Sequence, residues 1–328
     1  DNQDRIRNFI IAAYETYSGT DTPLEYVLLG GDDEIIPIRG VYAQVGGTYD
    51  WNLPCDAYYS NLDGNWDGNG NGVYGQNDDE VDMYPDLAVG RIPAETQEEF
   101  QNVFNKTYSY VDQVNVSDDI AYMLGENLNN NPLTWGGDYK DEIVPIIDPG
   151  IHIFHLYDRD GTYSTAAVRD AINFGVSIIN HMGHSNENVV FGQGSPDAHA
   201  YTNTEYGFAY TQGCYPAAFD ENTSGSGESV AENLVIATNG LYAFVGNTRY
   251  GWYSPGNTNG ASQFYDIAFF EGIYDQNIRE LGNALQYSRE ELINSAIQYG
   301  VMRWVYYELV VFGDPSVAVK ATNGNFPF

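Results

Sequence analysis

Four residues suited to catalysis or substrate binding each stand just after a short apolar run. Glu126 follows AYMLG, His184 follows SIINHMG, Cys214 follows GFAYTQG and Trp252 follows LYAFVGNTRYG. In an open sheet of parallel strands, ligands bind beyond the carboxyl ends of the strands. If these runs are neighbouring parallel strands, the four side chains project from one edge of the sheet. The pattern therefore predicts a single site.

A cysteine and a histidine on a shared edge have a specific chemistry. The His184 imidazole can take the proton of the Cys214 thiol and hold a thiolate ready for acyl transfer. Glu126 can orient the imidazole through its second nitrogen, as the third member of a triad does. The glycines before the histidine and the cysteine allow close backbone approach, so the N–H groups of Ser185 and Cys214 could form an oxyanion hole.

Other roles for the cysteines and histidines stay open. A lone cysteine is often a small buried hydrophobe, and a disulfide between Cys55 and Cys214 would abolish the mechanism. Cys55 lies in a polar loop, NLPCDAYYS, which predicts a surface or partly buried thiol. His181 lies two residues inside its strand, and we expect it to be structural. A zinc site with Cys214 would need histidines that lack the usual close ligand pairs, namely His152, His155 and His199.

Short apolar runs alternate with helical patterns, which indicates βαβ units and a mostly parallel sheet. Capping boxes at Thr96 with Glu99 and at Ser288 with Glu291 predict the starts of two helices. The strand candidates are residues 26–31 and 86–91 in the first half, and 120–125, 151–157, 176–182, 207–212 and 241–246 in the second. We therefore predict an α/β/α sandwich of two adjoining subdomains, residues 1–115 and the larger 116–328.

The Gly- and Asn-rich stretch at 61–75 contains the spacing of a calcium-binding loop. Oxygen donors occupy positions one, three, five, seven and twelve of an EF-hand pattern, with glycine at position six. These donors are Asp67, Asn69, Asn71, the Val73 carbonyl and Asp78. An all-oxygen ligand set suits Ca²⁺. The alternative is a solvated turn, because Asn-Gly and Asp-Gly pairs also form turns.

The composition is strongly acidic. Thirteen Lys and Arg residues against 46 Asp and Glu give a net charge of −33. Such a surface repels phosphate backbones and anionic lipids, so we expect no nucleic-acid partner, and basic proteins are favoured as substrates. No apolar run reaches the roughly 18 residues of a membrane span, so we expect no membrane insertion. Residues 1–17 have the pattern of an amphipathic helix without a signal-peptide layout.

An ordered set of segments resembles the gingipain-type cysteine peptidases, a family with a caspase-like fold. The segments are YVLLGGDDEIIP, YPDLAVGRIP, SIINHMGH, the strand ending in Cys214, AFVGNTRYGW and VFGDPSVAVK, and they span about residues 26–320. The resemblance implies a first subdomain without catalytic residues. It implies a second subdomain with Cys214 as nucleophile, His184 as general base and Glu126 as the acidic partner of the histidine.

The resemblance also implies a primary specificity pocket. Asp138 in WGGDYKDE looks like the acidic residue of that pocket in arginine-directed members, and Trp252 resembles its aromatic wall. A carboxylate facing an aromatic ring would hold a guanidinium by an ion pair and stacking. This implies cleavage after Arg more than after Lys. The residues alone leave alternatives: Asp138 could cap the helix predicted at Tyr139, and Arg249 could neutralise it.

The sequence therefore predicts a secreted, calcium-stabilised cysteine endopeptidase that acts on protein or peptide substrates. A transpeptidase would use the same thiol and imidazole, with an amine in place of water. The alternative from another class is a catalytically inert caspase-fold scaffold that binds a partner through its aromatic residues. The presence of Cys214 and His184 at one predicted edge argues against the scaffold. The sequence gives no indication of the oligomeric state.

Overall fold

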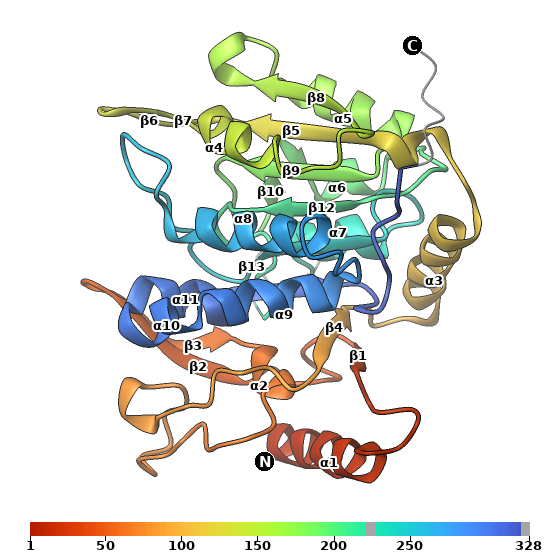
Figure 1. The fold of residues 1–328 in the computed structure, drawn as a ribbon. Helices are drawn as coiled ribbons and strands as arrows, with labels where there is room; N and C mark the ends of the chain where they lie inside the picture. The colour runs from red at the N-terminus through yellow and green to blue at the C-terminus, as the bar shows by residue number, and fades with distance from the viewer. Residues whose placement is uncertain (221–226, 323–328) are drawn as a thin grey trace.

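The computed structural model describes residues 1–220 and 227–322, and a central sheet of eight strands runs through it (Figure 1). Every neighbouring pair in this sheet is parallel except β13 with β14. The strand order is β1 (Tyr26–Gly30), β4 (Ala88–Ile92), β14 (Leu309–Phe312), β13 (Ala243–Asn247), β12 (Phe208–Thr211), β9 (Ile178–Met182), β5 (Ile120–Gly125), β8 (His152–Tyr157). The predicted mostly parallel α/β architecture is confirmed.

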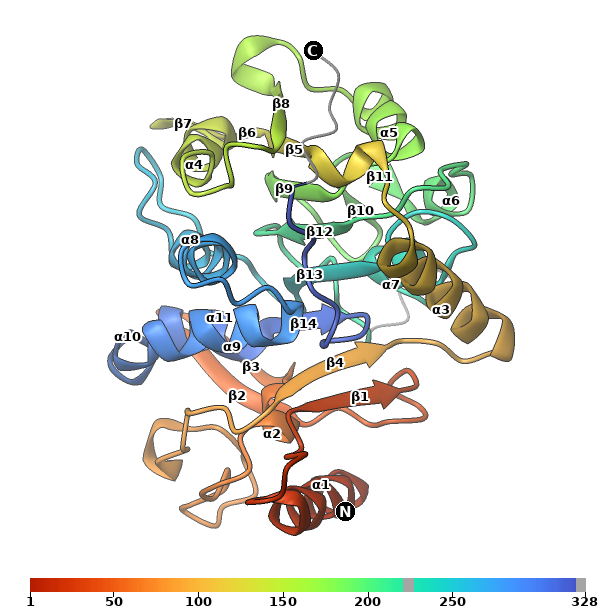
Figure 2. The ribbon, with the colours of Figure 1, turned by 45° about the vertical axis from the view of Figure 1, so that its right-hand side comes forward.

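Helices cover both faces of the sheet (Figure 2). Successive side chains of a strand point to opposite faces, and the core divides accordingly into two main apolar clusters. Ala121 and Met123 pack in the cluster that includes α4 (Gly136–Ile143), α8 (Ala261–Tyr274), α9 (Leu281–Glu291) and α11 (Gly300–Glu308). Ile120 and Leu124 pack on the other side with α3 (Gln97–Asp112), α5 (Thr165–Phe174) and α7 (Val230–Ile236). These layers form the predicted α/β/α sandwich.

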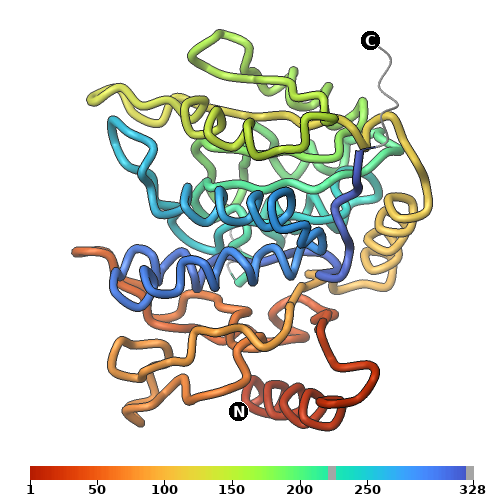
Figure 3. Tube along the Cα trace, in the orientation of Figure 1, coloured from red at the N-terminus to blue at the C-terminus, as the bar shows by residue number. Residues whose placement is uncertain are grey.

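Strand direction decides which residues share an edge. Because β14 is antiparallel to β13 and parallel to β4, the strands β1, β4 and β14 run against the other five. The carboxyl ends of β5, β9, β12 and β13 therefore lie together, at the edge opposite to those of β1 and β4. The chain trace places residues 1–90 at one end of the molecule and the green and cyan segments above them (Figure 3).

The two halves of the chain share this sheet. They join where β14 pairs with β4, with Phe312 opposite Arg91. The division into residues 1–115 and 116–328 stays a prediction.

Two predicted capping boxes had different outcomes. Thr96 accepts the Glu99 N–H at 3.3 Å and begins α3, as predicted. Ser288 does not begin a helix: it lies inside α9 and donates to the Leu285 carbonyl at 2.8 Å. The helix starts earlier because its buried stripe already begins at Leu281. A separate helix, α10 (Ile293–Gln298), follows it.

Smaller elements complete the described ranges. Helix α1 (Asn2–Tyr17) confirms the amphipathic pattern at the start of the chain. None of the helices in the described ranges has the length and apolarity to cross a bilayer. The remaining α-helices and β-strands are α2 (Ala57–Ser60), α6 (Ser195–Ala198), β2 (Gly40–Val45) with β3 (Thr48–Pro54), β6 (Asn127–Asn130) with β7 (Leu133–Trp135), and β10 (Val189–Val190) with β11 (Gln193–Gly194). Three short 3-10 helices lie at Asn77–Asp79, Val116–Asp119 and Asp158–Asp160.

Candidate active site

Cys214 stands on a sharp turn just after β12. The next residue, Tyr215, has a left-handed backbone with φ of 64°, and its N–H donates to the Arg249 carbonyl at 2.7 Å. A non-glycine residue keeps this conformation only where its surroundings enforce it. The partly exposed Cys214 thiol donates to the Gly251 carbonyl at 3.7 Å. Burial is the main cause that raises the pKa of this thiol to about 11.

His184 follows β9 and is exposed. Its backbone N–H donates to Glu126 Oε2 at 3.1 Å. Within the described residues, its imidazole has no hydrogen-bond partner, and in particular none joins it to the Cys214 thiol. The ring is therefore free to turn toward a substrate.

The loops that carry the histidine and the cysteine touch each other. Ser185 Oγ donates to the Cys214 carbonyl at 2.7 Å. A Cβ atom on Gly213 would lie 2.2 Å from Ser185 Oγ, so only glycine fits between the two loops. The backbone N–H groups of Ser185 and Cys214 make no hydrogen bond to any described residue. Two donors of the kind an oxyanion hole needs are thus available at this edge.

Glu126 follows β5, and its partners differ from the expected one. We expected its carboxylate to orient the His184 imidazole, but it reaches only the backbone N–H of that residue. Its other oxygen, Oε1, contacts His181 Nε2 at 3.1 Å and accepts the Tyr163 hydroxyl at 2.6 Å. Burial opposes ionisation of this carboxyl, but the hydrogen bonds of His181, Tyr163 and His184 outweigh burial and lower its pKa to about 2.

His181 is the residue whose place in the site sequence reasoning missed. It is fully buried, in line with a structural residue, yet it directly contacts Glu126. The strand register carries the signal: Leu124 of β5 lies opposite His181 of β9, so Glu126, two residues later, lies just beyond it.

Asp138 lies in the first turn of α4 with its side chain 52% exposed, and it forms an ion pair with Arg159. The N-cap of α4 is Trp135, so the helix-cap alternative for Asp138 is wrong. The alternative that Arg249 neutralises Asp138 is also wrong, because Arg249 pairs with Asp50 and Asp220 at 2.7 Å each.

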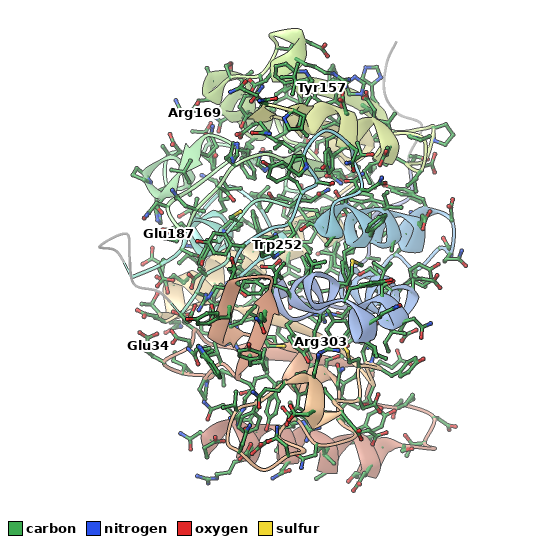
Figure 4. The ribbon with its side chains drawn as sticks, turned by 90° about the vertical axis from the view of Figure 1, so that its left-hand side faces the viewer. Glu34, Tyr157, Arg169, Glu187, Trp252 and Arg303 are labelled. Carbon is green, nitrogen blue, oxygen red and sulfur yellow. The ribbon has the colours of Figure 1, made fainter. Side chains whose placement is uncertain are left out.

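Trp252 lies in the segment that follows β13. Its ring meets Trp304 edge-on at 5.7 Å, and its backbone N–H donates to Ser262 Oγ at 2.8 Å. Arg159, the partner of Asp138, stacks over the Tyr157 ring at 4.7 Å. In Figure 4, which faces this edge of the sheet, Tyr157 lies near the top and Trp252 near the middle. No hydrogen bond or ion pair joins Asp138 to Trp252.

The alternatives for the thiols are resolved by burial and distance. Both cysteines are free, so no disulfide disables Cys214. Cys55 is fully buried, which corrects the expected surface or partly buried thiol, and burial raises its pKa to about 12. Within the described ranges, no group of three or more potential metal ligands includes a histidine or a cysteine. His199 instead contacts Asn233 at 2.8 Å.

The predicted calcium loop folds around its own side-chain oxygens. The Asp67 carboxylate accepts the Gly72 N–H at 3.1 Å. The amide oxygens of Asn69 and Asn71 each accept the N–H two residues further on, at 2.9 and 2.8 Å, the second from Val73. These bonds hold the first half of the loop in a tight turn.

The second half of the loop differs from the EF-hand pattern. Asp78, at the twelfth position, is exposed. Its neighbour Asp79 is buried and accepts the N–H groups of Asn69 and Gln76, at 3.2 and 2.7 Å. The oxygen-only donor set fits a hard cation, with the Asp79 carboxylate turned into the loop in place of that of Asp78.

Comparisons with known proteins agree with this fold. The model of peptidase family C25 matches residues 1–320, and no curated protein matches the chain. The crystal structure of the Arg-specific cysteine proteinase gingipain R (RgpB) is 20% identical with a TM-score of 0.73, covering 97% of this chain and 69% of that one.

Two further solved structures are similar. The complex of Porphyromonas gingivalis RgpB pro- and mature domains is 19% identical with a TM-score of 0.73, covering 97% and 70% of the two chains. A structure described as a protease is 16% identical with a TM-score of 0.69, covering 96% and 69%. Identities this low show the fold alone, whereas the family match spans almost the whole sequence, so the chain belongs to peptidase family C25 and is a cysteine peptidase.

Proposed function

We propose that the chain is an endopeptidase in which Cys214 is the nucleophile and His184 the general base. The observation that carries this proposal is the contact between the two loops, in which Ser185 Oγ donates to the Cys214 carbonyl at 2.7 Å. It keeps a thiol, an imidazole and two unused backbone N–H groups at one edge of the sheet. Acyl transfer to a cysteine needs these three features: a nucleophilic thiol, a base to take its proton and donors that bind the oxyanion.

The raised pKa of the Cys214 thiol, about 11, indicates how the attack begins. A thiol with this pKa is protonated at neutral pH, so its proton moves to His184 as sulfur attacks the peptide carbonyl. The backbone N–H groups of Ser185 and Cys214 stabilise the resulting oxyanion. His184 then gives the proton to the leaving amine, and water releases the acyl group from sulfur.

We propose that the substrate residue before the cleaved bond is basic, Arg more than Lys, and that Asp138 and Trp252 bind it. Support comes from the description of gingipain R as Arg-specific and from the exposed carboxylate of Asp138. A substrate guanidinium would replace Arg159 at Asp138, because both offer the same planar donors.

A peptide-library cleavage profile tests these assignments. Cys214→Ala is expected to abolish turnover, and Asp138→Asn to lower kcat/KM for Arg peptides by roughly a hundred-fold, the value of a lost charged contact. Asp141→Asn is the matched control, because Asp141 also pairs with Arg159, and it should retain activity within about three-fold. Equal losses of kcat/KM in the two Asp variants would mean that Asp138 does not bind the substrate side chain. An added amine nucleophile distinguishes transpeptidation from hydrolysis.

We further propose that the protein is secreted, for which the strongly acidic composition with few lysines is the support. We also propose that its 67–79 loop binds Ca²⁺, and here the support is the loop's oxygen-only donor set and its preformed turn. Ligand binding to the folded state raises the melting temperature, so calcium is expected to raise Tm and a chelator to lower it. Asp67→Asn should abolish most of that difference, whereas Asp21→Asn, in an exposed loop, should preserve it. A calcium response unchanged by Asp67→Asn would contradict this site.

A further inference from the structure

A continuous chain of hydrogen bonds runs beneath the site from the histidine loop to the cysteine loop. The His184 N–H donates to Glu126 Oε2 at 3.1 Å, and Glu126 Oε1 contacts His181 Nε2 at 3.1 Å. On the other side of its ring, His181 Nδ1 contacts Thr211 Oγ1 at 2.8 Å. Thr211 Oγ1 also accepts the Gly213 N–H at 3.0 Å. Gly213 is the residue directly before Cys214.

The chemistry of the partners fixes the direction of the two outer bonds. An ionised carboxylate can only accept, and Glu126 is ionised because its pKa is lowered to about 2. His181 Nε2 therefore carries the proton that it shares with Glu126, and the Gly213 N–H donates to Thr211 Oγ1. His181 Nδ1 and Thr211 Oγ1 share one proton between them, which sits on the hydroxyl when the ring is neutral and on Nδ1 when the ring is charged. Every group of the hydrogen-bond chain is satisfied in both arrangements.

The residues around the hydrogen-bond chain hold its side chains in place. His181 and Thr211 are fully buried, and the Phe191 ring meets the imidazole edge-on at 5.6 Å. A Cβ atom on Gly183 would lie 2.3 Å from His181 Nε2, so the histidine loop closes directly over the ring. Hydrogen bonds in such a dry site are strong, and an unpaired partner is costly.

We propose that His181 and Thr211 are positioning residues that hold the backbone of the histidine loop and the backbone before the nucleophile in one fixed relation, with Glu126 as the link. This inference rests on the proposed roles of Cys214 and His184. Glu126 then acts on His184 through its main chain, and the imidazole that the carboxylate orients is that of His181. A displacement of either loop misplaces thiol and imidazole, which lowers kcat more than it changes KM.

Thr211 offers a matched pair of variants. Thr211→Val keeps the shape of the side chain and removes the hydroxyl, whereas Thr211→Ser keeps the hydroxyl. We expect the Val variant to lose roughly ten-fold in kcat, the value of one hydrogen bond, with KM within about two-fold. The Ser variant should be close to wild type. A Val variant with wild-type kcat, or a Ser variant as impaired as the Val variant, would overturn the proposal.

His181 is tested by the pKa of Glu126, followed by NMR in protein labelled with ¹³C-glutamate. The titratable residues in contact with Glu126 are His181, Tyr163 and, through its backbone N–H, His184, with Asp158 acting on Tyr163. His181→Phe removes a donor while burial remains, so Glu126 should protonate at higher pH. His181→Gln supplies an amide N–H in place of Nε2 and should keep the pKa of Glu126 near its wild-type value. A Glu126 pKa that stays in place in the Phe variant would count against the role.

A readout independent of turnover separates this inference from the proposed function. In protein labelled with ¹⁵N-histidine, the resonance lost in His181→Gln identifies His181 among the five histidines. At pH 7 its Nε2 should carry a proton. A protein without peptidase activity that shows this proton would end the proposed function and leave the hydrogen-bond chain standing. A ring protonated at Nδ1 alone would overturn the hydrogen-bond chain whatever the activity.

Discussion

Several carboxyl groups lie close together where the segments after β1, before α3 and before α7 meet. Asp32 and Glu228 lie with Glu95 in a group whose carboxylate oxygens are within 4.8 Å of one another. Burial and the nearby carboxylates raise the pKa of Asp32 and that of Glu228 to about 7. The adjacent Glu232 is fully buried, and its pKa is raised as well. The folded protein therefore binds protons here that the unfolded chain releases near pH 4.

This cluster makes stability depend on pH. Because the folded-state pKa values are raised, the stabilisation is complete below about pH 4 and is lost as the pH rises through about 7. Between pH 5 and pH 8, measured with a chelator present, we expect Tm to fall. Asp32→Asn should flatten that slope and stabilise the protein at pH 8 by roughly 1 to 3 kcal/mol. A slope unchanged by Asp32→Asn would contradict this account.

For single residues, the sequence predicts where a side chain lies in the fold better than it predicts which residue that side chain contacts. Cys214 and His184 could be placed because each follows a short apolar strand, and strand ends collect at an edge. The histidine whose ring contacts Glu126 could not be predicted, because the choice between His181 and His184 depends on how deeply each side chain is buried and not on sequence spacing. The pairing of Asp138 with Arg159 likewise joins segments 21 residues apart that no local pattern connects.

Among the elements, a buried polar network joins those that carry the site. Lys140 of α4 is fully buried and donates to Asp266 of α8 and to Asn180 of β9, both at 2.5 Å. Gln212, just after β12, donates to the same Asp266 carboxylate at 2.6 Å. Burial lowers the pKa of Lys140, and the Asp266 charge opposes that effect. The network thus ties one helix layer to the two strands that precede the histidine and the cysteine.

Breaking this network should be costly, because removing one partner leaves the other charge buried and unpaired. We expect Lys140→Met to lower the free energy of unfolding by about 3 to 5 kcal/mol in urea. Lys140→Met combined with Asp266→Leu should recover part of that loss, since no charge remains. Arg169→Met breaks the more exposed pair with Asp197 and should cost less than about 1 kcal/mol. Similar losses in the two single variants would argue against the network.

Strands that end at a turn residue could be predicted from the sequence, and strands that depend on pairing with distant strands could not. β5 and β9 are apolar runs that end at Gly125 and near Gly183, and both were expected. β14 follows α11 with no turn residue between Glu308 and Leu309, so the local pattern gives no boundary. Its strand conformation comes from pairing with β13 and β4.

The whole molecule presents an almost uniformly anionic surface. All thirteen cationic side chains lie in the described ranges, and only Arg5 is exposed. The others are at least partly buried, and Arg91, Lys106 and Lys140 are fully so. Most of the acidic residues in the described ranges therefore repel one another without a cation as partner, which destabilises the compact state at low salt.

Salt should consequently stabilise the fold by screening. The Debye length falls from roughly 10 Å at 0.1 M to roughly 3 Å at 1 M ionic strength. We therefore expect Tm to rise by about 5 °C over this range of NaCl, measured with a chelator present. Sodium sulfate at equal ionic strength is the control, because preferential exclusion would make sulfate much more effective than chloride, whereas screening makes them equal. A Tm that does not rise with NaCl would mean that this surface charge does not limit stability.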